Sequence, residues 1–207
     1  MTGIEEQTRT GHAYEVRGST EHFRGRVFSV HTDEVAMPGG QVAARDYVAH
    51  IGAVAVVALD GQDRVVLVRQ YRHAVRRRLW ELPAGLVDVA GEDLAQVAAR
   101  ELAEEADLRP GRLDVLLDLH SSAGYSTEFV RVFLARELTD VPAADRYERR
   151  DEEADMAVAR VDLDEAVRLA AAGEITNAAC VAGVLAAARA RDAGWATLRP
   201  ADAPLPG

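Results

Sequence analysis

Residues 100–108, RELAEEADL, place four carboxylates within nine positions. If this stretch is helical, Glu101, Glu104 and Glu105 fall within about one third of the helix circumference. Glu101 and Glu105 are four positions apart, a spacing at which like charges destabilise a helix by about 0.2–0.5 kcal/mol. The negative end of the helix macrodipole adds to this repulsion. So many carboxylates on one arc require a nearby positive charge.

Two kinds of positive charge would serve. A hard divalent cation such as Mg²⁺ binds oxygen ligands and is commonly held by one or two carboxylates together with substrate phosphates. The glutamates would then be metal ligands. Alternatively, Arg100 and neighbouring arginines neutralise an acidic surface patch. The stretch by itself leaves both interpretations open.

The composition narrows the possible function classes. The chain of 207 residues has 34 acidic and 24 basic residues, which gives a net charge of -10. This balance argues against a nucleic acid or an anionic membrane as the main partner. All 24 basic residues are arginine. Without lysine, a Walker-type phosphate loop and Schiff-base catalysis are excluded.

The number and spacing of cysteines and histidines indicate a reducing compartment and argue against a zinc site. The single cysteine, Cys180, lies in an Ala-rich run and is expected in the core. The six histidines show no zinc-ligand spacing. The N-terminus lacks the regions of a signal peptide, and no apolar run approaches the ~20 residues of a membrane span. We therefore expect a cytoplasmic protein.

A helix must carry the carboxylates, and its bounds follow from the pattern. Ala, Leu and Glu predict a helix from about residue 93 to 106, ending near Asp107. Two apolar, β-branched runs at 51–60 and 64–72, separated by GQD, predict a buried hairpin. The other predicted elements are two strands around the loop AGYST, a further strand and two helices, at 113–122, 128–137, 154–163, 164–173 and 176–191.

The order of these elements predicts the fold class. Residues 1–48 have turns and short alternating strands, which indicate a small N-terminal β region. Strands and helices then mix over residues 49–195, which predicts an α+β domain, an α/β/α sandwich on a mixed sheet. Residues 140–153 are polar and predict an exposed loop. Residues 196–207 are expected to form a flexible tail.

The stretch GLVDVAGEDLAQVAARELAEEADL resembles the Nudix box, G-x5-E-x7-R-E-U-x-E-E-x-G-U with U aliphatic. It departs from that pattern twice. Six residues rather than five separate Gly85 from Glu92, and Asp107 stands where the pattern has Gly. Asp is one of the few non-glycine residues that adopt the left-handed conformation found at helix ends. The matching positions are Gly85, Glu92, Arg100, Glu101, Leu102, Glu104, Glu105 and Leu108.

Four further segments resemble the ADP-ribose pyrophosphatase branch of the Nudix family. They are QYRHAVRRRLWELPAG, AGYSTEFVRVFLA, DEEADM and GEITNAACVAGVL. The resemblance covers roughly residues 15 to 190. It implies a Nudix-type α/β/α sandwich and a homodimer whose subunits exchange the N-terminal β region.

The resemblance also implies a metal site on the acidic helix. Glu101 and Glu105 would be the principal ligands of Mg²⁺ or Mn²⁺, aided by the backbone carbonyl of Ala84 and by Glu104. Arg100 would orient these carboxylates through salt bridges, as an indirect support for the metal. Glu92 would have a similar supporting role.

A general base and substrate contacts follow by the same resemblance. The base is expected in DEEADM, with Glu153 as first choice and Glu152 as reserve; the alternative is an acidic surface loop. Arg72 would stack on the adenine, and Glu81 would accept from its amino group. The loop residues that would approach the terminal ribose and phosphates are Gly124, Tyr125, Ser126 and Glu128.

The sequence therefore predicts a metal-dependent hydrolase of the diphosphate linkage in ADP-ribose, with AMP and ribose 5-phosphate as products. Its expected partners are a small nucleoside diphosphate sugar and a second copy of the chain, with no nucleic acid and no membrane. One alternative is a pyrophosphatase for another nucleoside diphosphate sugar. A second is a non-catalytic module that senses ADP-ribose, which the intact acids of the box and the acidic net charge disfavour.

Overall fold

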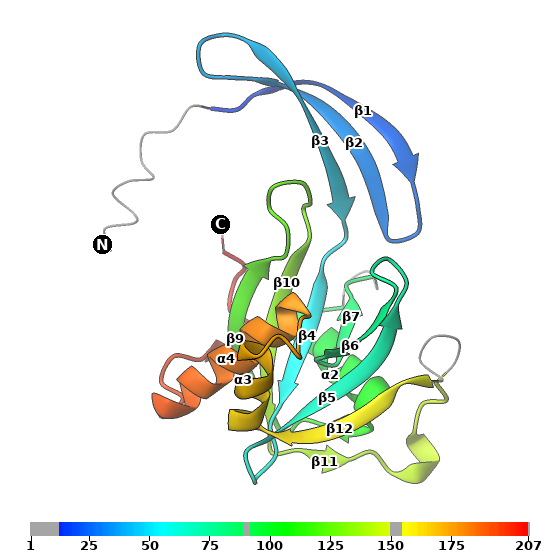
Figure 1. Ribbon diagram of the computed structural model, residues 1–207, viewed down its shortest axis with the longest axis vertical. Helices are drawn as coiled ribbons and strands as arrows, with labels where there is room; N and C mark the ends of the chain where they lie inside the picture. Colours follow the sequence, from blue (N-terminus) through cyan, green and yellow to red (C-terminus); the bar gives the residue numbers. More distant parts are fainter. Residues whose placement is uncertain (1–12, 89–91, 150–154, 207) are drawn as a thin grey trace. The chain divides into compact units, whose positions relative to one another are not determined.

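The computed structural model describes residues 13–88, 92–149 and 155–206 (Figure 1). The chain divides into two compact units. The first consists of Met1–His50 with Ser122–Glu128, and the second of Ile51–Ser121 with Phe129–Gly207. The two units are described in turn.

The first unit is an antiparallel sheet of β1 (Val16–Arg24), β2 (Phe28–Ala36) and β3 (Val42–His50) in that order. The predicted MPGGQ turn joins β2 to β3, where Gly39 and Gly40 have φ values of 93° and 85°. Such positive φ values favour glycine. The N-terminal β region predicted from the sequence is thus a three-stranded sheet in the described residues.

The sheet of the first unit has almost no core of its own. Of its described residues, only Ser29 is buried. Phe23, Phe28 and Val42 are 53%, 43% and 56% exposed. A small sheet is stable in water only when an apolar face is covered. These exposed side chains therefore require a covering surface.

The second unit is built on a mixed sheet with the strand order β13-β9-β10-β4-β7. β10 runs parallel to β4, and the other neighbours within this sheet are antiparallel. β9 and β10 are the two strands predicted around the AGYST loop. The strand bounds are Ala53–Ala58 for β4, Ala84–Leu86 for β7, Arg112–His120 for β9, Phe129–Arg136 for β10 and Arg199–Pro200 for β13.

A second sheet of this unit has the order β12-β5-β6. It consists of β5 (Arg64–Arg72), β6 (Arg77–Glu81) and β12 (Ala157–Asp162). The predicted hairpin of residues 51–60 with 64–72 is therefore wrong, because β4 and β5 lie in different sheets and meet only at the bridge between Leu59 and Val65. β4 and residues 65–68 of β5 are buried on both faces, so these stretches carry no alternation that would identify a neighbour.

Helices cover both faces of the mixed sheet. α2 (Leu94–Ala106) packs on one face, and α3 (Leu163–Ala171) and α4 (Ala178–Asp192) pack on the other (Figure 1). Alternate residues of β4 serve the two cores, with Val56 on the α2 side and Val57 on the α4 side. This layering confirms the predicted α+β class and α/β/α sandwich.

Smaller features complete the second unit. β8 (Leu108–Arg109) pairs with β11 (Thr139–Asp140), and a 3-10 turn, η1 (Ala143–Asp145), follows. Cys180 is buried in the core as expected, and burial raises the pKa of its thiol to about 12. None of the described helices has the length and apolar character needed to span a membrane.

The C-terminal segment, expected to be a flexible tail, makes defined contacts. β13 pairs with β9. The guanidinium of Arg131, only 3% exposed, donates to the backbone carbonyls of Ala203 and Pro204 at 2.6 and 3.0 Å. Buried donors need acceptors, and the segment supplies two of them.

Arg131 and Arg199 also share one carboxylate, that of Asp118. Arg131 donates to it at 2.8 and 3.1 Å, and Arg199 donates at 2.7 Å. Burial by itself raises the pKa of Asp118, but the hydrogen bonds from both arginines outweigh burial and hold that pKa below its ordinary value. This ion cluster ties the C-terminal segment to the sheet.

Candidate active site

The helix that carries the candidate site has well-defined ends. Asp93 caps its N-terminus in a capping box with Gln96, whose backbone N–H donates to the Asp93 carboxylate at 2.8 Å. Asp107 ends the helix with φ 55° and ψ 35°, the left-handed conformation. The helix predicted for residues 93–106 is confirmed. The caps fix which side chains of RELAEEADL face the sheet.

Glu101 packs directly against the backbone of β7. A Cβ atom added to Gly85 would lie 2.0 Å from the Glu101 carboxyl carbon and 2.1 Å from one of its oxygens. Only glycine leaves room for this carboxylate at that position. The first glycine of the Nudix-like stretch is therefore required by contact with its first helical acid.

Glu105 is also held by β7. This residue is 4% exposed, and its carboxylate accepts a hydrogen bond of 2.9 Å from the backbone N–H of Ala84. A buried carboxylate needs such a donor, since desolvation without one is costly. β7 pairs with β4, so the contact connects the acidic helix to the centre of the mixed sheet.

Arg100 lies among the remaining acids. Its guanidinium donates to Glu101 at 2.7 Å, to Glu92 at 3.2 and 3.3 Å, and is paired with Glu104 at 3.5 Å. The hydrogen bond that Arg100 donates to Glu92 raises the pKa of Arg100 against the opposing effect of burial, and the charges of Glu101, Glu92 and Glu104 raise it further. The positive charge required by RELAEEADL is thus present within the same helix.

The donor set has the chemistry of a hard cation site. Glu101, Glu104 and Glu105 offer carboxylate oxygens, and Ala84 offers a backbone carbonyl, which are the ligands that Mg²⁺ and Mn²⁺ prefer. Within the described residues, no group of three His, Cys, Asp or Glu side chains is arranged as a metal cage. A cation that also takes substrate phosphate oxygens needs only one or two protein carboxylates. The residues therefore fit such a cation.

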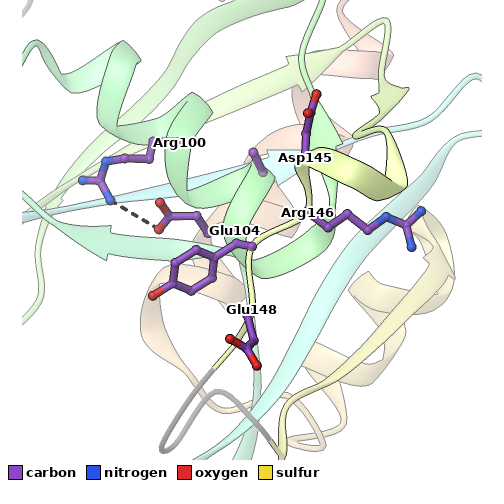
Figure 2. A pocket seen from close by; sticks show the side chains of 7 residues that line it. Arg100, Glu104, Asp145, Arg146 and Glu148 are labelled. Carbon is purple, nitrogen blue, oxygen red and sulfur yellow. Dashed lines mark hydrogen bonds and ion pairs between the residues drawn. The ribbon is translucent and has the colours of Figure 1, made fainter.

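A cleft of about 650 Å³ opens beside this helix. Arg100 and Glu104 face it from α2, and the segment after η1 forms the other side (Figure 2). Asp145, at the end of η1, and Arg146 and Glu148, just after it, line that side. The complete lining is Arg100, Ala103, Glu104, Asp145, Arg146, Tyr147 and Glu148. The cleft is large enough for a nucleotide-sized ligand.

Arg72 and Glu81, the expected adenine contacts, lie on the paired strands β5 and β6, where Glu81 is opposite Val68 and Arg72 is opposite Arg77. The Arg72 guanidinium donates to both oxygens of the Glu81 carboxylate, at 3.0 and 3.2 Å from Nε and at 2.7 Å from Nη2. The Glu81 side chain is 3% exposed, whereas that of Arg72 is 45% exposed. Arg72 therefore neutralises a buried carboxylate in this structure.

The loop predicted to approach the terminal ribose belongs to the first unit, whereas α2 belongs to the second. The loop runs along β3, where the backbone N–H of Val48 donates to the Tyr125 carbonyl at 2.8 Å. The Ser126 hydroxyl accepts from the backbone N–H of Glu128 at 3.1 Å. Gly124 has open space where a side chain would be, and Tyr125 is 62% exposed.

The candidate bases Glu152 and Glu153 lie outside the described residues. Next to them in the sequence, the structure adds a contact that the sequence did not predict. Arg149 donates to the Asp107 carboxylate at 2.8 Å and to the Glu104 carbonyl at 2.9 Å. In the sequence, Arg149 belongs to the polar stretch RYERR, in which nothing distinguishes it from a solvated residue.

Comparisons with known proteins place these features in a family. The Nudix domain profile matches residues 49–182. The chain is 46% identical over 191 residues to the ADP-ribose pyrophosphatase of Mycobacterium tuberculosis, covering 92% of this chain and 90% of that protein. It is 33% identical over 156 residues to the ADP-ribose pyrophosphatase of Bacillus subtilis, covering 75% of this chain and 82% of that protein.

Two further similarities concern the fold and a different substrate. The crystal structure of an ADP compounds hydrolase superposes with a TM-score of 0.75 at 19% identity, covering 90% of this chain and 99% of that chain. At this identity the match supports the fold. The chain is also 31% identical over 171 residues to a CMP-5'-(N-acetyl-N-hydroxy-3-aminopropyl)phosphonate hydrolase of Streptomyces rubellomurinus, covering 82% of this chain and 80% of that protein.

The contact between Gly85 and Glu101 yields a prediction for metal binding. Gly85→Ala places a methyl group on the Glu101 carboxylate, so this side chain must leave its present position. We expect Mn²⁺ affinity, measured by isothermal titration calorimetry, to fall by roughly 10–100-fold. Gly61→Ala is the matched control, because an added Cβ there meets no atom within 4 Å. Equal affinity in wild type and Gly85→Ala would contradict the assignment.

Proposed function

The chain belongs to the Nudix family, and from this premise we propose that it hydrolyses the diphosphate linkage of ADP-ribose to AMP and ribose 5-phosphate. The observation that carries the proposal is the 46% identity to an ADP-ribose pyrophosphatase over 92% of the chain. The carboxylates of α2 can bind the divalent cation that this reaction needs. A diphosphate is anionic and repels a nucleophile unless its charge is neutralised.

The reaction depends on a divalent cation, as is general for Nudix ADP-ribose pyrophosphatases. We assign Mg²⁺ or Mn²⁺, with Glu101 and Glu105 as principal ligands, supported by Glu104 and the carbonyl of Ala84. When bound, such a cation neutralises phosphate charge and lowers the pKa of a water molecule. The support for this assignment is the oxygen-only donor set on α2 and β7.

Arg100 and Glu92 act on the ligands rather than on the substrate. The guanidinium of Arg100 restrains the carboxylates of Glu101 and Glu104. Glu92 accepts two hydrogen bonds from Arg100 and so fixes the orientation of the guanidinium plane. This network keeps the ligands in place between turnovers, when substrate phosphates are gone.

The adenine is assigned to Arg72 and Glu81. A carboxylate only accepts hydrogen bonds, so Glu81 selects the amino edge of the base. In the structure both oxygens of Glu81 accept from Arg72. In this assignment the adenine amino group replaces one guanidinium donor on Glu81 and Arg72 stacks on the ring; the half-exposed Arg72 side chain supports this.

At the other end of the substrate, Gly124, Tyr125, Ser126 and Glu128 are assigned to the terminal ribose and its phosphate. The exposed Tyr125 ring and the open space at Gly124 support this assignment. Hydroxyl and carboxylate groups of this loop can hydrogen bond to sugar hydroxyls.

A carboxylate completes the chemical step. Glu153, or Glu152 as reserve, accepts a proton from water while the water oxygen forms a bond to one phosphorus of the diphosphate. The bond from that phosphorus to the bridging oxygen breaks, and the leaving phosphate keeps the electron pair. Because a bound cation acidifies the water, an ordinary glutamate suffices as the base.

A different nucleoside diphosphate derivative is the second candidate substrate. The similarity to a hydrolase that acts on a CMP phosphonate favours it, because that relative changes the base while 31% of the aligned residues are retained. The catalytic residues would be the same, and the contacts of Arg72 and Glu81 would decide between adenine and another base.

We also propose that the chain is a homodimer in which residues 1–48 contact a second copy. The support is the first unit, whose described residues form a sheet with exposed Phe23, Phe28 and Val42. Phe23 and Phe28 lie together, with ring centroids 5.9 Å apart, and exposed apolar side chains that lie together at a surface mark an interaction site. Residues 49–195 would then be the catalytic domain.

The substrate proposal is tested with a panel of nucleoside diphosphate derivatives, Mg²⁺ or Mn²⁺, and separation of the products. We expect ADP-ribose to give AMP and ribose 5-phosphate. Glu105→Gln should lower kcat/KM by about 100-fold or more, since it removes a buried ligand. Glu165→Gln, in the exposed pair with Arg168, is the control and should leave turnover unchanged. A panel in which ADP-ribose is inert would refute the proposal.

The choice of base is tested by Glu153→Gln and Glu152→Gln separately. Removing the base should lower kcat by about 10²–10⁴-fold while Mn²⁺ affinity stays the same, because the base is not a metal ligand. Calorimetry and steady-state kinetics measure the two effects. Loss of activity in Glu152→Gln alone would assign the role to Glu152.

The dimer is tested by sedimentation equilibrium of the full chain. The expected mass is about twice the chain mass of 22.4 kDa. Phe28→Glu should lower the mass toward that of the monomer, because it places a charge on the apolar surface. Val75→Glu, at a residue that is 54% exposed in the second unit, is the matched control and should remain dimeric. A wild-type mass of 22.4 kDa would be decisive against the dimer.

A further inference from the structure

Asp107 occupies the position at which the Nudix box has glycine, and its side chain is engaged. Its carboxylate accepts from Arg149 Nη2 at 2.8 Å and lies 3.9 Å from Arg146 Nε. The backbone of Asp107 adopts φ 55°, which glycine would adopt with less strain. Backbone geometry therefore does not explain an aspartate here, whereas the contact with Arg149 does.

The guanidinium of Arg149 donates hydrogen bonds to two acceptors at the end of α2. Nη2 donates to Asp107, and Nε donates to the carbonyl of Glu104 at 2.9 Å. Carbonyls in the last turn of a helix lack partners within the helix, and a cation near them is favourable. Arg149 thus closes the C-terminal end of α2 at the residue that carries a candidate metal ligand.

The ion pair of Arg149 with Asp107 is less exposed to solvent than the neighbouring ion pair of Arg109 with Asp145. The side chains of Arg149 and Asp107 are 22% and 26% exposed. Those of Arg109 and Asp145 are 54% and 55% exposed, and their contact is longer, at 3.4 Å. Exposed pairs contribute little, because water and salt screen them. The contact between Asp107 and Arg149 is therefore the stronger restraint on this segment.

The restrained segment forms one side of the cleft. Asp145, Arg146 and Glu148 stand across from Arg100 and Glu104 (Figure 2). Arg149 follows this lining directly in the sequence, and the acidic stretch with both candidate bases begins two residues later, at Asp151. A pair that fixes Arg149 on α2 therefore fixes the wall relative to Glu104.

We propose that Asp107 and Arg149 are positioning residues for hydrolysis: their ion pair holds residues 145–149 against the end of α2, so that this segment forms the cleft wall opposite Glu104. The inference rests on the proposed function, because its purpose is to align that wall with the metal ligands. Neither residue contacts the reacting atoms. The aspartate that departs from the box is thus an adaptation of the site.

The kinetic test uses the full chain with ADP-ribose and Mg²⁺. Asp107→Gly removes the carboxylate and restores the residue of the box, so thermal stability should stay the same or rise. Its kcat should fall by about ten- to a hundredfold, because misalignment of about 1 Å has effects of this size. KM should change less than kcat. Arg168→Gln, in an exposed pair on α3, is the control and should behave as wild type.

A conservative variant and a double variant distinguish a positioning role of the ion pair from a general structural role. Arg149→Lys keeps the charge with a single donor group and should retain more activity than Arg149→Gln. The double variant Asp107→Gly with Arg149→Gln should lose no more than the worse single variant, because each single variant already removes the contact between Asp107 and Arg149. Additive losses, or unchanged kcat in Asp107→Gly, would overturn the proposal.

A readout independent of activity keeps the two proposals apart. Hydrogen exchange at the Asp145 amide, which donates to the Pro142 carbonyl at 2.8 Å, should accelerate in Asp107→Gly and Arg149→Gln, while exchange within α2 stays protected. Unchanged exchange in both variants would overturn the inference even if ADP-ribose is hydrolysed. A wild-type protein that is inert toward ADP-ribose but shows the faster exchange in the variants would instead overturn the proposed function.

Discussion

The site depends on one guanidinium that lies among like charges. Glu92, Glu101 and Glu104 all contact Arg100, and without it an acidic final helical turn would repel itself. Because the three contacts are within reach of one planar group, they also fix carboxylate orientation. Charge neutralisation and ligand alignment are therefore the same interaction, and either would be lost with the other.

The sheet supplies the second half of that arrangement. β7 is only three residues long, yet it contacts both principal carboxylates: Glu101 packs on Gly85, and Glu105 accepts from the N–H of Ala84. β7 is in turn held by pairing with β4 at the centre of the mixed sheet. The layered fold thus transmits the rigidity of its core directly to the ligands, through backbone atoms rather than flexible side chains.

Local signals in the sequence predicted the helix and its acids, because a stretch rich in Ala, Leu and Glu favours a helix that ends near Asp107. The capping box of Asp93 with Gln96 was found only in the structure. The relation of β4 to β5 was not predictable, because strands buried on both faces lack the alternation that marks a partner. Contacts between distant residues were equally hidden. Arg149 and Asp107 are 42 positions apart, and no periodic pattern connects a polar loop to a helix end.

The anchoring of the C-terminal segment has a consequence for how this chain tolerates change. The buried guanidinium of Arg131 recognises carbonyl oxygens, which every amino acid carries, so residues 203 and 204 are free to drift in identity. Their path, in contrast, is constrained. Trimming before Ala203 would remove two acceptors of the buried Arg131 guanidinium and leave only its ion pair with Asp118, so the path of this segment matters more than its side chains.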